Sequence, residues 1–530
     1  MSDGYIVCSS LSFSWPDDTP VFDDLSFSVP GGRTGLVASN GAGKSTLLKL
    51  IAGDLKPAGG GVHVDGVLGY LPQDLPFARE QTVGQALGVD RIIAALLAIE
   101  SGDADEENFA VVGNDWDVEE RTRAELDRLG LGDVTLDRSL ATLSGGQVIS
   151  LGLAAQLLKR PDVLLLDEPT NNLDRTGRDR LIEVLRSWSG CLLVVSHDRE
   201  LLDEMDRIAA LEPHGEIRWY GGTFTEYEQA VRNEREVAER QVRNAEADLK
   251  RQKREMQQAR ERAQRRASNA SRNLADAGLA RIVAGNLKRD AQVSAAKQAE
   301  THASRVGDAQ ARLDQASRAA RQEDRIALEL PGTNVPAGKT VFEADGMRAG
   351  YGDKVIFDGA DLTIRGPERI ALTGDNGAGK STLMREIRQH AAVTTAYLSQ
   401  RLDLLDENGT VAENLGRFAP ALTDAERMNL LARFLFRGAR AHLPVGVLSG
   451  GERLRATLAC VLFAEPAPRL LLLDEPTNNL DLVSVGQLES ALTAYQGAFV
   501  VVSHDERFLA EIGVNRRLRL AGGRLIEDHG

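Results

Sequence analysis

The fold is decided by a short stretch that occurs twice, first as Ala38-Ser39-Asn40-Gly41-Ala42-Gly43-Lys44-Ser45-Thr46 and later as Gly374-Asp375-Asn376-Gly377-Ala378-Gly379-Lys380-Ser381-Thr382. The pattern Gly-x-x-x-x-Gly-Lys-Ser curls the backbone so that successive N–H groups point at phosphate oxygens. Its glycines permit a close approach that a side chain would block. Ala38 replaces the opening glycine, but the phosphate-binding N–H groups follow later in the loop. We therefore expect both loops to bind nucleotide, and the extra methyl group predicts a slower first site.

Each loop is followed by the same two motifs in the same order. The first motif is Leu143-Ser144-Gly145-Gly146-Gln147 in one copy and Leu448-Ser449-Gly450-Gly451-Glu452 in the other. The second motif is Leu164-Leu165-Leu166-Asp167-Glu168-Pro169-Thr170, repeated as Leu471-Leu472-Leu473-Asp474-Glu475-Pro476-Thr477. This repetition indicates a duplicated nucleotide-hydrolysing module.

Four residue types in each module have the chemistry that phosphate hydrolysis needs. The loop lysine should reach the β- and γ-phosphates, and the next serine should hold Mg²⁺. The aspartate that ends the Leu-rich run should also hold Mg²⁺, and the glutamate after it should polarise the attacking water. In the two modules these residues are Lys44 and Lys380, Ser45 and Ser381, Asp167 and Asp474, and Glu168 and Glu475. A solvated turn is the alternative for a strand-end Asp-Glu pair, and the nearby phosphate loops argue against it.

The composition is that of an ordinary globular chain. Of its 530 residues, 42% are hydrophobic and 27% are charged, and the length suffices for several domains. No run of about 18 apolar residues could span a membrane, and the N-terminus lacks the pattern of a signal peptide. Cys8, Cys191 and Cys460 show no metal-binding spacing. We expect a cytoplasmic protein without membrane insertion.

The chain divides by composition into three parts. We expect one ATPase domain at 1–222, a linker at 223–335 and a second ATPase domain at 336–530. The apolar runs Val163 to Leu166 and Leu470 to Leu473 suit parallel strands that are buried on both faces. The predicted fold class is α/β, with two tandem P-loop ATPase domains joined by an α-helical hairpin linker.

The linker is predicted to form two long antiparallel helices. No proline lies between Pro213 and Pro331. Apolar residues recur at a seven-residue helical repeat. They are Val242, Ala245, Leu249, Met256 and Ala263 and, on the return, Val293, Ala296, Ala303, Val306 and Leu313. The segment from Ser268 to Asn286 is predicted to be the connecting loop.

Basic charge is concentrated in this linker. The whole chain carries a net charge of −15, yet Lys250 to Arg289 holds twelve Lys and Arg against three acidic residues. Such a segment indicates an element that faces a polyanion. Candidates for RNA phosphate contacts are Arg251, Lys253, Arg254, Arg262, Arg265, Arg266, Lys288 and Arg289. The alternatives are a passive spacer and a solvated helix face.

Four apolar residues fall in the predicted loop at the tip of the hairpin. They are Leu274, Leu279, Ile282 and Val283. A loop gains nothing from apolar side chains in water, so these residues favour contact with a partner. Packing on one another to cap the hairpin is the alternative.

The order of the motifs resembles the ATP-binding cassette (ABC) family over both modules. Leu-Ser-Gly-Gly-Gln between the two phosphate-binding motifs is that family's signature. The resemblance implies that Gln73 and Gln400 are Q-loop residues, with roles in catalysis and at the metal ion. It also implies that His197 and His504 are switch histidines that contact the γ-phosphate. Trp15 (or Phe13) and Tyr351 match aromatic residues that stack on adenine.

In this family the modules pair head to tail, so the resemblance implies two composite ATP sites within a monomeric chain. One would contain Asn40, Gly41, Ala42, Gly43, Lys44, Ser45 and Thr46 with Ser449, Gly450, Gly451 and Glu452. The other would contain Asn376, Gly377, Ala378, Gly379, Lys380, Ser381 and Thr382 with Ser144, Gly145, Gly146 and Gln147.

Two tandem cassettes joined by a basic helical hairpin resemble the ABC-F subfamily. So does the wording Asp-Glu-Pro-Thr-Asn-Asn-Leu-Asp, found at Asp167 to Asp174 and at Asp474 to Asp481. The resemblance implies an ATPase that uses ATP and Mg²⁺ and binds the ribosome near the tRNA exit site. Its linker would reach toward the peptidyl-transferase centre and contact rRNA and P-site tRNA.

The function implied by this resemblance is antibiotic resistance by ribosomal protection, or rescue of stalled translation. The alternative is the ATPase component of an ABC transporter that works with a separate membrane protein. A DNA-repair or structural-maintenance ATPase would instead carry a longer coiled coil inside one cassette.

Overall fold

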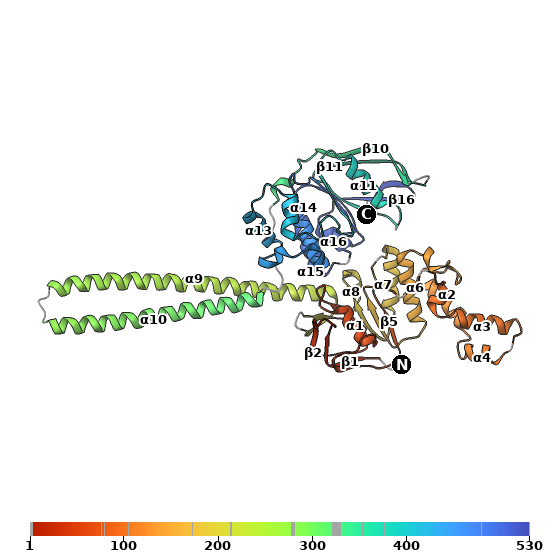
Figure 1. Cartoon of the computed structure of the whole chain (residues 1–530), viewed down its shortest axis with the longest axis horizontal. Coiled ribbons are helices and arrows are strands. Elements are labelled where there is room, and N and C mark those ends of the chain that lie inside the picture. The colour runs from red at the N-terminus through yellow and green to blue at the C-terminus, as the bar shows by residue number, and fades with distance from the viewer. Residues whose placement is uncertain are drawn as a thin grey trace. The chain divides into compact units, whose positions relative to one another are not determined.

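The computed structural model contains two compact units, one formed by Met1–Thr225 with Arg325–Gly530 and the other by Glu226–Asp324 (Figure 1). The residues that it describes are 4–75, 77–78, 80–103, 105–171, 173–212, 215–276, 281–320, 330–351, 354–375, 377–478 and 480–528. The first unit holds both ATPase modules, and the second holds the helical linker.

A six-stranded sheet forms the centre of the first module, in the order β5-β6-β7-β3-β8-β9. Its strands are β3 (Gly32–Val37), β5 (Leu68–Leu71), β6 (Val163–Asp167), β7 (Cys191–Val195), β8 (Arg207–Leu211) and β9 (Ile217–Gly221). All neighbours are parallel except β8 and β9. Every residue of β6 is buried, which confirms the prediction of a parallel strand covered on both faces.

A smaller antiparallel sheet completes the strands of the first module, in the order β2-β1-β4. Its strands are β1 (Ile6–Ser14), β2 (Pro20–Val29) and β4 (Gly59–Val64). Apolar residues of β1 and β2 pack with Leu47 and Leu48 of the first helix in one core.

The second module repeats this plan. Its six-stranded sheet has the order β13-β14-β15-β12-β16-β17, and only β17 is antiparallel to its neighbour. The strands are β12 (Arg369–Thr373), β13 (Thr395–Leu398), β14 (Leu470–Asp474), β15 (Ala498–Val502), β16 (Arg516–Ala521) and β17 (Arg524–Glu527). A separate antiparallel pair contains β10 (Thr340–Tyr351) and β11 (Lys354–Arg365). The predicted α/β class is thus confirmed.

Helices flank both sheets. In the first module they are α1 (Lys44–Ala52), α2 (Val83–Leu87), α3 (Asp90–Glu100), α4 (Glu106–Val112), α5 (Val118–Arg128), α6 (Gly145–Leu157), α7 (Arg175–Arg186) and α8 (Arg199–Asp203), with the 3₁₀ turn η1 (Leu140–Thr142). In the second they are α11 (Lys380–His390), α12 (Val411–Phe418), α13 (Asp424–Arg433), α14 (Gly450–Leu462), α15 (Leu482–Ala494) and α16 (Glu506–Glu511), with η2 (Pro331–Thr333), η3 (Gly438–His442) and η4 (Val445–Val447).

The linker is a hairpin of two long helices that run side by side, α9 (Phe224–Asp276) and α10 (Arg281–Ala320). An ion pair of 3.2 Å between Arg312 and Asp248 joins them. Along the middle of α9, side chains that are buried or partly buried recur at heptad spacing. They are Ala238, Val242, Ala245, Leu249, Gln252, Met256 and Ala259. The predicted seam is therefore correct in α9 as far as Met256, whereas Ala263 is exposed.

The predicted seam of α10 needs correction. Ala296 and Ala303 are exposed, and the partly or fully buried positions described in α10 are His302, Val306, Ala309, Gln310, Leu313, Ala316 and Ser317. The predicted seam positions Val306 and Leu313 are correct, and the buried residue between them is Ala309. The structure does not describe the side chain of Val293.

The predicted loop from Ser268 to Asn286 is wrong for most of its length. Helix α9 continues to Asp276 and α10 begins at Arg281, so Leu274, Ile282 and Val283 belong to helices. The small and polar residues of this segment are compatible with helix because no proline interrupts it. Leu279 lies outside the described residues, as do the side chains of the other three.

None of the described helices is both long enough and apolar enough to cross a membrane.

Replacing Leu249 by alanine should loosen the hairpin. Leu249 is 8% exposed in a seam that has little other apolar bulk, so we expect the free energy of opening to fall by about 2 kcal/mol. Hydrogen exchange of the α9 amides in the whole chain would measure this as a roughly 30-fold acceleration. Val237→Ala is the matched control, because Val237 is 52% exposed on the same helix. Equal acceleration in both variants would contradict the seam.

Candidate active site

The candidate residues meet at one edge of each six-stranded sheet. Parallel strands have their carboxyl ends at the same edge, where the loops that follow them lie together. In the first module β3 leads into the phosphate loop, β6 ends at Asp167, and His197 follows β7. In the second module, β12, β14 and β15 lead to the same three features. Topology thus gathers segments that are far apart in the sequence.

The first phosphate loop ends in a helix N-terminus that no side chain caps. Gly43 adopts a left-handed φ of 94° just before α1, and as the N-cap residue it has no side chain to bond the N–H groups of the first turn. A Cβ at Gly43 would lie 2.6 Å from Val21 Cγ1, so only glycine fits this turn. The N–H groups of the first turn remain available to an anion.

The second loop has the same geometry. Gly379 adopts a φ of 104° before α11, and a Cβ there would lie 2.2 Å from Ile356 Cγ2. Both loops therefore fit a phosphate chain held by backbone N–H groups.

Both loop lysines are buried and held within their own loops. Lys44 Nζ donates to the carbonyl oxygens of Ala38 (2.9 Å) and Ser39 (3.3 Å). Lys380 Nζ donates to the carbonyl oxygens of Gly374 (2.6 Å) and Asp375 (3.2 Å). Burial lowers the pKa of both ammonium groups, and the neighbouring carboxylates oppose this shift.

The opening residues of the two loops differ in backbone conformation. Gly374 has a φ of 146°, and a Cβ there would lie 2.4 Å from the carbonyl oxygen of Leu520. Ala38 is not among the described residues with a positive φ, and its methyl group packs against the core of the first module. The first loop accommodates alanine where the second requires glycine.

Each predicted catalytic glutamate is buried beside the predicted switch histidine. Glu168 Oε1 lies 3.2 Å from His197 Nε2, and Glu475 Oε1 lies 3.3 Å from His504 Nε2. The N–H of His197 also donates to Glu168 Oε2 (3.3 Å). Both glutamates have left-handed backbones, with φ of 50° and 48°. Such strain in a non-glycine residue persists only where the surrounding structure enforces it, and it is common at active sites.

Burial shifts the protonation equilibria of these groups. It raises the pKa of Glu168 to about 8 and that of Glu475 to about 7. It also lowers the pKa of His197 to about 3 and that of His504 to about 4. Near neutral pH both histidines are therefore uncharged, and the glutamates titrate in the range useful to a general base.

The predicted metal-binding aspartates end the central strands. Asp167 forms a hydrogen bond with Ser45, and burial raises the pKa of its carboxyl group. Its Oδ1 is buried without a hydrogen-bond partner in the described part of the chain. Buried oxygen atoms of this kind fit a Mg²⁺ ion and its water ligands. In the second module Asp474 Oδ2 accepts a hydrogen bond from the hydroxyl group of Tyr397 (2.8 Å).

The signature motifs form the N-termini of helices α6 and α14. Ser144 Oγ accepts from the N–H of Gln147 (3.2 Å), and Gln147 Oε1 accepts from the N–H of Ser144 (2.9 Å). Ser449 and Glu452 form the same reciprocal pair. This capping box orients the Ser-Gly-Gly segment in both modules.

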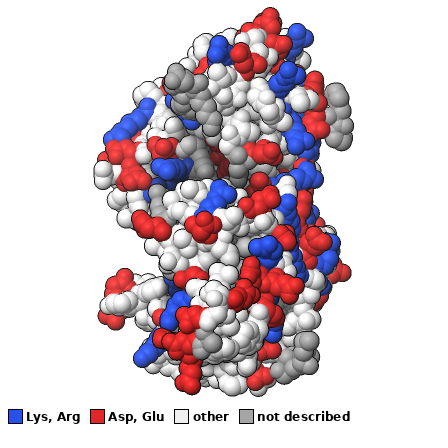
Figure 2. Space-filling view, turned by 90° about the vertical axis from the view of Figure 1, so that its right-hand side faces the viewer, with Lys and Arg blue, Asp and Glu red and all other residues white. Residues whose placement is uncertain are grey.

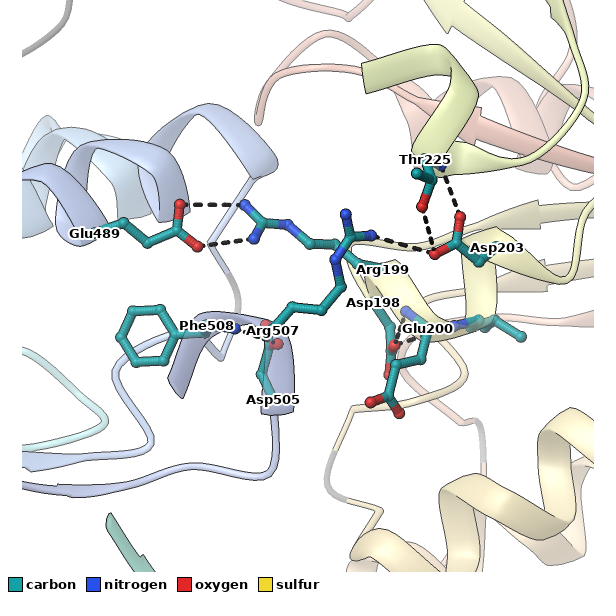
Figure 3. A network of polar contacts seen from close by, with 10 residues as sticks. Asp198, Arg199, Glu200, Asp203, Thr225, Glu489, Asp505, Arg507 and Phe508 are labelled. Atoms are coloured by element: carbon teal, nitrogen blue, oxygen red, sulfur yellow. Dashed lines mark hydrogen bonds and ion pairs between the residues drawn. The ribbon is translucent and has the colours of Figure 1, made fainter. Parts of the chain in front are cut away.

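Several contacts join the two modules near these sites. The N–H of Asn40, in the first phosphate loop, donates to Asp481 Oδ2 of the second module (2.7 Å). Farther from the loop, Arg199 of α8 bonds to both carboxylate oxygens of Glu489 in α15 (2.7 and 3.5 Å) (Figure 3). The first centre is thus in direct contact with the opposite module.

Other predicted residues lie near the edge without a described contact to the centres. Gln73 and Gln400 follow β5 and β13, and their side chains are exposed. Trp15 is 39% exposed, whereas Phe13 is buried beneath it, with the ring centroids 5.2 Å apart. Trp15 is therefore the better candidate for contact with a base.

For some predicted residues the structure describes no position or no side chain. Asn376 lies outside the described residues, as do the side chains of Tyr351, Arg266, Lys288 and Arg289. Of the remaining loop residues, Thr46 and Thr382 are buried in α1 and α11. Gly41 and Gly377 both have left-handed φ values, and Ala42 and Ala378 follow them.

Sequence reasoning missed three residues at the sites: Tyr397, Asp481 and Arg178. Asp481 ends the repeated Asp474 to Asp481 motif, and Tyr397 lies three residues before Gln400. For both residues, the available signal was a polar side chain beside a nucleotide motif. Arg178 had no such signal. It belongs to the first module, yet its Nη1 donates to the carbonyl oxygen of His504 (3.2 Å).

Comparison with known proteins agrees with this geometry. The family model described as "ABC transporter" matches residues 22–171 and 357–478. Tylosin resistance ATP-binding protein TlrC of Streptomyces fradiae is 33% identical, with 93% of each chain covered. Energy-dependent translational throttle protein EttA of Mycobacterium tuberculosis is 29% identical, with 93% of this chain and 87% of EttA covered.

Two further relatives extend the comparison. Probable ATP-binding protein YheS of Escherichia coli K12 is 31% identical, with 91% of this chain and 73% of YheS covered. Among solved structures, the archaeal ribosome recycling factor aABCE1, in complex with the ribosomal stalk protein aP1, superposes with a TM-score of 0.58. Its sequence is 20% identical, over 97% of this chain and 89% of that one, so it shows the fold alone.

ATP hydrolysis should rise with pH as the buried glutamates ionise. A general base acts in its ionised form, and kcat/KM follows the pKa of the free enzyme. In the Glu475→Gln chain only the first centre keeps its base, and kcat/KM should rise with pH around pH 8, the pKa of Glu168. In the Glu168→Gln chain only the second centre keeps its base, and kcat/KM should rise around pH 7, the pKa of Glu475. Steady-state ATPase assays from pH 5.5 to 9.5 would measure both, and flat profiles would contradict the assignment.

The opening positions of the two loops should respond in opposite ways to exchange. Gly374→Ala places a methyl group against Leu520 in a left-handed backbone, so we expect a loss of about 1–3 kcal/mol and at least a tenfold loss of ATPase activity in the Glu168→Gln chain. Ala38→Gly should change stability by less than about 1 kcal/mol. Thermal unfolding and ATPase assays would decide, and a harmless Gly374→Ala would refute this account.

Proposed function

The chain belongs to the ABC-F subfamily of ATP-binding cassette ATPases and hydrolyses ATP; on this premise we propose that it is a ribosome-bound translation factor. It binds near the tRNA exit site, and its hairpin reaches toward the peptidyl-transferase centre to contact rRNA and P-site tRNA. The outcome is resistance to a ribosome-targeting antibiotic by ribosomal protection, or rescue of stalled translation.

The distribution of charge along the hairpin carries this proposal. From Glu226 to Asp248, helix α9 holds seven acidic and four basic residues, whereas Lys250 to Arg289 holds three acidic and twelve basic residues. On the face drawn in Figure 2, acidic and basic side chains are interspersed and neither sign covers the surface continuously. A positive segment at the far end of a helical hairpin suits RNA, which is recognised largely through its backbone and shape.

Not every predicted basic residue is equally suited to bind RNA. Arg251 forms an ion pair with Asp248 (2.5 Å), so part of its charge is already neutralised. Lys253, Arg254, Arg262 and Arg265 are exposed and are the better candidates. The names of two relatives, with tylosin resistance and a translational throttle, support a role at the ribosome.

ATP and Mg²⁺ fit both centres. Lys44 and Lys380 would bind the phosphates together with the N–H groups of the first turns of α1 and α11. Ser45 with Asp167, and Ser381 with Asp474, would hold Mg²⁺, which neutralises charge on the phosphates when it is bound. Glu168 and Glu475 would orient the attacking water, with His197 and His504 beside them. The signature segment of the opposite module would close each site.

The rival function is that of the ATPase component of a membrane transporter. Both functions share the ATP chemistry, and they differ in the partner. Co-sedimentation of the chain with ribosomes or with membrane vesicles separates them. Binding to vesicles without binding to ribosomes would replace the proposed function by its rival.

A chain with both Glu168→Gln and Glu475→Gln should remain on ribosomes in ATP. Glutamine keeps the size of the side chain but cannot act as a base, so hydrolysis should fall roughly 100-fold or more, while ATP still closes the sites. Co-sedimentation and release kinetics would show slower dissociation than for the parent chain. Release at the parent rate would contradict the proposal.

Reversing four hairpin charges should weaken ribosome binding. Changing Lys253, Arg254, Arg262 and Arg265 to glutamate should reduce the slope of log affinity against log salt by roughly 3, because fewer counterions are released. ATP affinity should not change. The matched control reverses Arg123, Lys159, Arg433 and Arg524, which are exposed on the two modules. Equal effects of both sets would show that net charge, not the hairpin, governs binding.

A further inference from the structure

Arg178 crosses from the first module to the second ATP centre. It lies in the first turn of α7, four residues after Asp174, and its side chain is only 13% exposed. Its Nε lies 3.0 Å from Asp198 Oδ2 of its own module. Its Nη1 donates to the carbonyl oxygen of His504 (3.2 Å). One guanidinium thus contacts the segments that carry both switch histidines.

At the position that corresponds to Arg178, the second module has an apolar residue. Asp174 and Asp481 are corresponding N-caps of α7 and α15, and Val485 occupies the position four residues after Asp481. Val485 is a buried apolar residue, 4% exposed. Arg178 thus reaches the second centre, whereas Val485 packs in the hydrophobic core of its own module.

We propose that Arg178 is a positioning residue of the second ATP centre, where it holds the carbonyl oxygen of His504 and so fixes the switch histidine against Glu475. A charge-assisted hydrogen bond to a backbone carbonyl restrains the residue that bears it. His504 Nε2 lies 3.3 Å from Glu475 Oε1, so displacement of His504 disturbs the base directly.

The first centre depends less on Arg178, although Arg178 also contacts Asp198. Asp198 Oδ1 accepts from the N–H groups of Glu200 (3.0 Å) and Leu201 (3.2 Å), which hold it as the N-cap of α8. His197 precedes this cap and keeps its backbone contact to Glu168 without Arg178. Loss of the arginine should therefore affect one centre selectively.

Variants of Arg178 in two backgrounds test this selectivity. In the Glu168→Gln chain, where the second centre remains, Arg178→Met should lower kcat about tenfold and change KM for ATP less than about threefold. In the Glu475→Gln chain the same substitution should change kcat by less than about twofold. Equal losses in both backgrounds, or no loss in the first, would overturn the assignment. The Glu475→Gln background also shows whether the variant folds.

A conservative variant gives a second readout. Arg178→Lys keeps the positive charge but not the planar guanidinium that lies near Asp198 and donates to His504, so it should still lower kcat in the Glu168→Gln chain. Full activity of Arg178→Lys would contradict the positioning role.

A different set of contacts meets at Asp203, the last residue of α8. Asp203 Oδ1 accepts from the N–H of Thr225 (2.7 Å) and Oδ2 accepts from its hydroxyl group (3.0 Å), both in the first turn of α9. Arg507 of α16 donates to the same Oδ2 (3.2 Å). Figure 3 shows Thr225 and Arg507 converging on this carboxylate.

The three helices that meet at Asp203 have related positions in the chain. Helix α8 follows His197, α16 follows His504, and α9 is the first helix of the linker. Arg507 also lies over the ring of Phe224, 6.0 Å from its centroid, and Phe224 is 1% exposed. The start of the linker helix is therefore anchored to the segments behind both switch histidines.

From this junction we infer that Asp203 couples the state of the two ATP centres to the linker helix, a step that rests on the proposed function of the hairpin. A shift of His197 would move α8, which ends in Asp203. A shift of His504 would move α16, whose Arg507 bonds to the same carboxylate. That carboxylate accepts from the N–H and the hydroxyl group of Thr225, in the first turn of α9. The ion pair is partly exposed, with side-chain exposures of 31% and 30%, so it is weak enough to break and re-form.

Hydrogen exchange of residues 224–240 tests the coupling without ribosomes. In the chain with Glu168→Gln and Glu475→Gln, ATP should increase protection of this segment. Asp203→Asn should abolish most of that increase and leave ATP affinity unchanged. Glu506→Gln is the matched control, because its carboxylate pairs with Arg175 of the first module (3.3 Å) and with Arg517 of its own module (2.8 Å), and neither pair touches α9.

The outcomes separate this inference from the proposed function. Full ATP-dependent protection in Asp203→Asn, an equal loss in Glu506→Gln, or no ATP effect in the parent would overturn the coupling. Ribosome co-sedimentation of the parent chain tests the proposed function independently of these measurements.

Discussion

Burial of a carboxylate at the end of a central parallel strand is the constraint on which each ATP centre depends. Because β6 and β14 are covered on both faces, the glutamate that follows each strand leaves the sheet in a strained left-handed conformation and remains buried. Burial gives it a pKa close to neutrality and keeps the adjacent histidine uncharged. The sheet that forms the core therefore also sets the chemistry of the base.

The two centres are built alike but are not equivalent. The first loop opens on an alanine with an ordinary backbone, whereas the second opens on a glycine that no other residue could replace. Asp481 contacts the first loop from the opposite module, and Arg178 contacts the second centre from the other side. The lysine, serine, aspartate and glutamate that handle phosphate are the same in both modules, whereas Arg178 corresponds to Val485.

The hairpin shows how little apolar surface is needed to hold two long helices together. In its described part the seam has one buried leucine and several alanines, so its helices depend also on helix-forming residues and on ion pairs such as Arg312 with Asp248. Because few positions of the hairpin are apolar, most of its surface is polar. The far half can then carry the basic charge, and the half near Thr225 can remain acidic.

The sequence by itself determined the fold class, the two phosphate loops, the strand-end carboxylates and the heptad of α9, because each depends on local residue order or on short periodicity. It misplaced the turn of the hairpin, since Gly and Asn lower helix propensity without forbidding a helix. It also could not assign Tyr397, Arg178 or Asp203, whose partners lie in distant segments. Those contacts follow from strand order and from the pairing of the modules, which bring together residues that no local pattern connects. Tertiary structure alone therefore decided which carboxylates are buried beside a histidine and which side chains cross between the modules.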